Sequence, residues 1–138
     1  MAESYKGLTI KFGADYTSLS SALSSIGKQA STAQSKLKSV QSALKMDPGN
    51  TTLLAKQQEA LASKVSATKD KLDAYSQGLQ SLKDKQSTGA TLTEKEQRQY
   101  EQLSTSISTT EARLKTYTKQ LGQARVEYSA QESALGRL

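Results

Sequence analysis

Apolar and small residues that alternate three and four positions apart constrain this chain more than any other feature. The pattern runs from Leu19 through Ile26 and Leu37 to Leu44. This spacing is the a/d seam of a coiled coil, which is narrower than the apolar stripe of a helix on a globular core. The segment therefore predicts a long helix that packs against other long helices.

The stretch "ALKMDPGN" interrupts this pattern with the only proline of the chain, Pro48. Proline cannot continue the helical hydrogen-bond ladder and disfavours helical geometry at Asp47, whereas Gly49 can adopt the positive φ of a tight reversal. Asn50 or Thr51 can then cap a second helix. Asp47, Pro48, Gly49 and Asn50 are predicted to form the turn of a helical hairpin.

The same spacing resumes after the turn and predicts a second helix. Folding it back on the first helix places Leu44 opposite Leu54 and Leu37 opposite Leu61, so that each a position faces a d position, as antiparallel pairing requires. We therefore expect residues 16–86 to form an antiparallel hairpin that turns at residues 47–50.

A softer break at "QSTGAT" precedes a third predicted helix, where Thr93 and Glu96 match a capping box. Its seam can pair with the second helix, so a three-helix antiparallel bundle is available. We expect this helix, residues 93–138, to be truncated from a longer protein or to pack on other subunits. The predicted seam comprises Leu23, Ile26, Leu37, Val40, Leu44, Leu54, Leu61, Val65, Leu72, Tyr75, Leu79, Leu82, Tyr100, Leu103, Ile107, Leu114, Tyr117, Leu121 and Tyr128.

The first fifteen residues are predicted to form an arm with one short strand. In "GLTIKFG", residues 7–13, Leu8, Ile10 and Phe12 alternate with polar residues. Nothing else in the chain has a β pattern, so this strand either pairs with another chain or lies along a helix. The predicted fold class is all-α: a long helical hairpin plus a third long helix, as a coiled coil or three-helix bundle, after a short strand.

The composition argues against an enzyme. Only 35% of the residues are apolar, and the chain has no Cys and no His. These absences exclude disulfides, thiol nucleophiles and imidazole catalysis. The carboxylates of Asp70 and Asp73 are predicted to lie on a solvated helix face, without the pocket that would raise a pKa. We therefore expect no catalytic, cofactor-binding or metal-binding residues, no small-molecule substrate and no membrane-spanning segment.

The positive charge is concentrated in residues 16–46, which contain four Lys and no acidic residue. Such a run is either a solvated face or a phosphate-binding surface, and no aromatic residues alternate with the Lys to stack on bases. An alternative function is therefore a nucleic-acid-binding or adaptor-like, chaperone-like coiled coil that uses the basic face of residues 28–45.

The motifs "GLTIKFGAD" and "SVQSALKMDPGNTTLLAKQQEAL" together resemble the amino-terminal region of phage tail tape measure proteins. In that family a short strand precedes a helix that ends in a similar Asp-Pro-Gly-Asn turn, and a second helix returns after the turn. The resemblance is most specific from Leu44 to Gln57.

The resemblance implies a structural protein of a phage or prophage tail that sets tail length and templates assembly of the tail tube. It implies a homo-oligomer whose partners are the tail tube protein, tail assembly chaperones and tail tip proteins. The implied location is the lumen of the virion tail tube, after assembly in the host cytoplasm.

Overall fold

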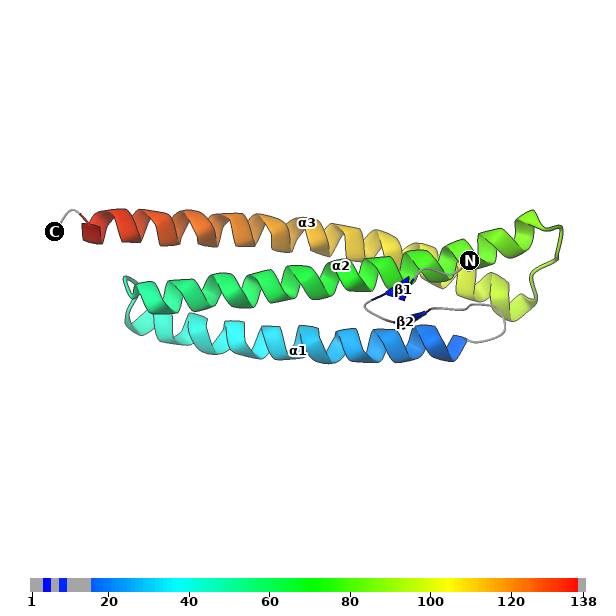
Figure 1. Ribbon diagram of the computed structural model, residues 1–138, viewed down its shortest axis with the longest axis horizontal. Helices are drawn as coiled ribbons and strands as arrows, with labels where there is room; N and C mark the ends of the chain where they lie inside the picture. The colour runs from blue at the N-terminus through cyan, green and yellow to red at the C-terminus, as the bar shows by residue number, and fades with distance from the viewer. Residues whose placement is uncertain (1–3, 6–7, 10–15, 137–138) are drawn as a thin grey trace.

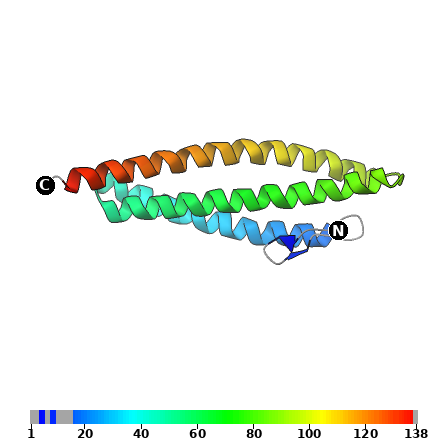
Figure 2. The ribbon, with the colours of Figure 1, turned by 45° about the horizontal axis from the view of Figure 1, so that its top comes forward.

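Three long helices make up nearly all of the described chain. The computed structural model describes residues 4–5, 8–9 and 16–136. Its helices are α1 (Tyr16–Met46), α2 (Thr51–Ser87) and α3 (Glu94–Gly136). They lie side by side as a rod: α2 lies between α1 and α3 in Figure 1, and α1 crosses behind α2 in Figure 2. The expected all-α class with three helices is confirmed.

The middle helix makes the close contacts with both of its neighbours. α2 packs against α1 on one side and α3 on another, whereas within these described helices no Cα atom of α1 lies within 8 Å of a Cα atom of α3. Closely packed helices have axes about 8–10 Å apart, so α1 and α3 are not packed neighbours at backbone level. α2 must therefore bury residues on two of its faces.

Two strands of two residues each lie beside the helices. β1 (Ser4–Tyr5) and β2 (Leu8–Thr9) pair antiparallel, with Ser4 opposite Thr9 and Tyr5 opposite Leu8. β2 lies against α1 and β1 against α2, near the start of α1 (Figure 1). The sequence analysis found no partner for the predicted strand within the chain. The partner in the structure, β1, has only two residues, which are too few to show an alternating pattern.

The structure describes only part of that predicted strand. Leu8 lies in β2, whereas Ile10 and Phe12 lie outside the described residues. A strand as long as residues 7–13, and its pairing with another chain, stay predictions.

The buried apolar side chains form two clusters along the rod. The first comprises Leu19, Ala22, Ile26, Ala67, Ala74, Leu82, Leu92 and Leu103. The second comprises Leu37, Ala60, Leu61, Val65, Leu121 and Ala124. Each cluster draws on all three helices, so the core is divided between two positions along the rod and does not form one compact centre.

Candidate functional site

All the residues of the predicted heptad seam are buried or half-buried. Its buried members are Ile26, Leu37, Val40, Leu54, Leu61, Val65, Leu82, Leu103 and Leu121, and its half-buried members are Leu23, Leu44, Leu72, Tyr75, Leu79, Tyr100, Ile107, Leu114, Tyr117 and Tyr128. Each of these side chains is at least partly covered. Tyr75, Tyr100 and Tyr117 pack against the buried clusters, and Tyr128 is half-buried.

α2 buries a second stripe that the seam prediction missed. Ala60, Ala67, Ala74 and Gly78 are all buried, and the three alanines recur every seven residues. The sequence analysis assigned a single seam to α2, yet these three alanines share the core clusters with leucines of α1 and α3. The seven-residue repeat of alanine was the signal that could have identified this stripe.

The hairpin turn is closed by Asp47 and Asn50. The Asn50 side-chain oxygen accepts a hydrogen bond from the Leu53 backbone N–H at 3.0 Å, which caps α2, and its side-chain nitrogen donates to Asp47 Oδ2 at 3.1 Å. The Asn50 N–H also donates to the Asp47 carbonyl at 3.2 Å. Asn50 therefore satisfies a donor of α2 that would otherwise lack a partner.

The role predicted for Gly49 in this turn was wrong. Among the glycines that the structure describes, the one with a positive φ is Gly89, at +87°, in the second connection. Gly49 instead approaches α3: a Cβ added to it would lie 3.2 Å from Nε2 of Gln131. The Asp47-Pro48-Gly49-Asn50 turn reverses the chain without left-handed backbone geometry.

Lys64 connects the three helices at the middle of the rod. Its Nζ donates to the Gln34 side-chain oxygen on α1 at 2.6 Å and lies 4.0 Å from the centre of the Tyr117 ring on α3. Gln34 lies three residues before Leu37, and Lys64 three residues after Leu61. This contact has the same hairpin register that the seam predicts, although the sequence analysis did not single out Lys64.

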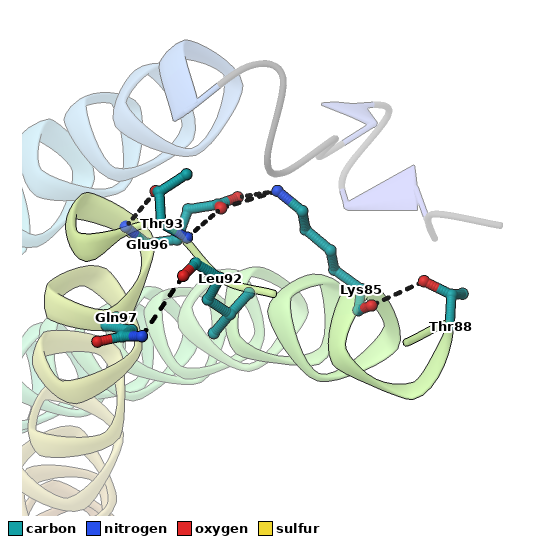
Figure 3. A network of polar contacts seen from close by, with 6 residues as sticks. All are labelled: Lys85, Thr88, Leu92, Thr93, Glu96 and Gln97. Atoms are coloured by element: carbon teal, nitrogen blue, oxygen red, sulfur yellow. Dashed lines mark hydrogen bonds and ion pairs between the residues drawn. The ribbon is translucent and has the colours of Figure 1, made fainter. Parts of the chain in front are cut away.

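The connection between α2 and α3 contains a cluster of charged and polar hydrogen bonds (Figure 3). Lys85 Nζ lies 2.7 Å from both carboxylate oxygens of Glu96. Glu96 Oε1 accepts from the Thr93 N–H at 3.0 Å, and Thr93 Oγ1 accepts from the Glu96 N–H at 3.1 Å. The predicted capping box of Thr93 and Glu96 is confirmed, and Lys85 extends it to α2.

Glu96 is buried, with 6% of its surface exposed, yet its carboxylate has several donors. The hydrogen bond from Lys85 is the main reason that the pKa of Glu96 lies below its ordinary value, and the Thr93 N–H lowers the pKa further. Beside it, Leu92 is also buried although it belongs to the connection, and its carbonyl accepts from Gln97 Nε2 at 3.4 Å (Figure 3).

Asp70 differs from its predicted solvated environment. Its side chain is half-buried, and burial raises the pKa of the Asp70 carboxyl, with a smaller contribution from the nearby Asp73 carboxylate. Over the described ranges, no three His, Cys, Asp or Glu side chains form a group that could hold a metal ion. No helix in the described part of the chain is both long and apolar enough to cross a membrane.

Comparison with known proteins gave no assignment. No protein-family model matches the chain, and neither a curated protein nor a solved structure shows significant similarity to it.

Proposed function

We propose that this chain is the amino-terminal structural module of a phage tail tape measure protein, which sets tail length and templates assembly of the tail tube. One observation carries the proposal. The segment that resembles the family, Leu44 to Gln57, is the segment that ends α1, reverses the chain and caps α2. The resemblance and the hairpin turn therefore coincide in the same residues.

The tape measure protein would set tail length by the length of its extended part. The three-helix rod suits a thicker module at one end of that protein better than the extended part. A single extended helix advances about 1.5 Å per residue, whereas a chain that folds back twice advances much less. In this proposal the module is a homo-oligomer in the lumen of the tail tube, assembled in the host cytoplasm. Its partners are the tail tube protein, tail assembly chaperones and tail tip proteins.

An in-frame deletion tests this role. Codons 2–138 are removed from the gene in its phage or prophage, and tails are measured by electron microscopy. If residues 1–138 are an assembly module at one end of the protein, their loss should abolish tails or make tail lengths irregular. Tails uniformly shorter by about 200 Å would make the segment part of the extended ruler, at about 1.5 Å per residue. Tails of normal number and length would contradict the whole proposal.

A second candidate is the nucleic-acid-binding or adaptor-like coiled coil that uses the basic face of residues 28–45. One observation favours it: Lys28, Lys36, Lys38 and Lys45 are all exposed on α1. Binding through phosphates alone would make the affinity for duplex DNA fall steeply between low and physiological salt. The tail module should bind little DNA at physiological salt.

A further inference from the structure

A shallow groove runs along the outer side of the hairpin, between α1 and α2. Two adjoining cavities of about 460 and 780 Å³ form it, and both are lined by Lys36 and Ser63. Of the described residues, only members of α1 and α2 line these cavities. α3 therefore leaves this side of the hairpin open.

Each helix contributes to this groove a set of exposed residues with heptad spacing. Among the lining residues, one such set on α1 is Gln29, Thr32, Lys36 and Ser39, and one on α2 is Lys56, Glu59, Ser63 and Ser66. On both helices successive members are three, four and three positions apart, and all eight are exposed. Two such stripes side by side are the surface that a further helix of a bundle packs against.

Small residues and charge define what the groove can accept. Ala33, Val40 and Ala60 are buried at its floor, and serines on both helices leave room for a neighbouring helix. Lys28, Lys36 and Lys56 lie along the groove with one acidic residue, Glu59. A partner with Glu or Asp flanking a narrow apolar stripe complements both the shape and the charge.

We propose that the groove between α1 and α2 binds an amphipathic acidic helix of a partner protein. An acidic helix suits the observations better than a nucleic acid, because the groove has an apolar floor of small residues and heptad spacing on both walls. Phosphates need neither feature, and the described residues that line the groove include no aromatic side chain for bases. The surface depends on α1 and α2 alone and does not require a role in a phage tail.

The test uses the full chain and a fluorescent peptide of about 28 residues, with Ala and Leu at the a and d positions and Glu at e and g. A second peptide carries Lys at e and g. A short DNA duplex is the control for negative charge without an apolar helix face. Anisotropy titrations should show saturable binding of the Glu peptide, at least tenfold tighter than that of the Lys peptide or the duplex. No saturable binding, or equal binding of the duplex, would overturn the proposal.

Two charge reversals on the same helix localise the binding. Lys36→Glu places an acidic side chain in the groove and should weaken Glu-peptide binding at least tenfold. Lys38→Glu makes the same change of charge at an exposed position that does not line the groove, and it should have little effect. Equal losses in both variants would mean that net charge alone attracts the peptide and would refute docking in the groove.

A bulky substitution tests the shape of the groove without a change of charge. Ser63 is exposed and lines both cavities, so Ser63→Trp should fill the groove and reduce Glu-peptide binding at least tenfold. Circular dichroism confirms that the helices of each variant are intact. If the folded Ser63→Trp protein bound the Glu peptide as tightly as the unmodified protein does, the peptide would not lie in the groove beside Ser63.

Discussion

At the scale of single residues, Glu96 makes the connection between α2 and α3 sensitive to pH. Its carboxylate accepts hydrogen bonds from Lys85 and Thr93, which hold its pKa below the ordinary value of 4.5. A lowered pKa stabilises the folded chain above the ordinary pKa, and this contribution is lost as the pH falls through the folded-state pKa. The free energy of unfolding should therefore decrease below about pH 4.5.

The Glu96→Gln variant should lose part of this dependence, because an amide does not titrate yet can still complete a capping box. Urea titrations from neutral to acidic pH measure the difference. Glu94→Gln is the matched control, since Glu94 is exposed in the same helical turn. If Glu96→Gln followed the pH profile of the unmodified protein, the Lys85–Glu96 contact would not account for its acid sensitivity.

Glycine substitutions in the two connections should differ in their effect on stability. Gly89 has a φ of +87°, so Gly89→Ala should destabilise the fold by about 1–2 kcal/mol, the cost of left-handed geometry for an L-residue. Gly49→Ala should cost less than about 0.5 kcal/mol, because its Cβ meets only the flexible end of Gln131. Urea unfolding compares them, and a larger cost at Gly49 would contradict the described turn.

At the scale of elements, the seam of α1 makes a prediction about stability. Leu37 is 3% exposed and belongs to the core cluster with Leu61 and Leu121. Leu37→Ala should lower the free energy of unfolding by about 2–4 kcal/mol through lost burial and a cavity. Lys38→Ala, at the exposed neighbouring position, should change it little. An unchanged melting temperature for Leu37→Ala would remove Leu37 from the core.

The helices and their seam could be predicted because periodic leucines and the Asp-Pro-Gly-Asn segment are strong local signals. The second buried stripe of α2 was missed although its alanines at positions 60, 67 and 74 recur every seven residues, because the sequence analysis assigned one seam to α2 and used it for both neighbouring helices. Only the presence of α1 and α3 on two sides of α2 decides that these positions are buried. Lys64 was missed for the same reason, since its contacts with Gln34 and Tyr117 come from two other helices.

At the scale of the whole molecule, the rod combines a covered middle helix with outer helices that retain free faces. α1 and α3 each pack closely against α2 but not against each other. Large exposed apolar residues occur on α3, where Val126 is 69% exposed and Leu135 46% exposed. Long helices with one covered face commonly complete their packing in an assembly with other helices.

This arrangement leads to our prediction that the chain is a homo-oligomer in solution. Light scattering measures the mass of residues 1–138 and of the same chain without residues 1–14. A multiple of 14.9 kDa is expected for the full chain. If the deletion reduces the mass to that of one chain, residues 1–14 mediate self-assembly. If the number of chains stays the same, the helices mediate it. A monomer at high protein concentration would contradict self-assembly, because the three helices would then be stable with their outer faces exposed to solvent.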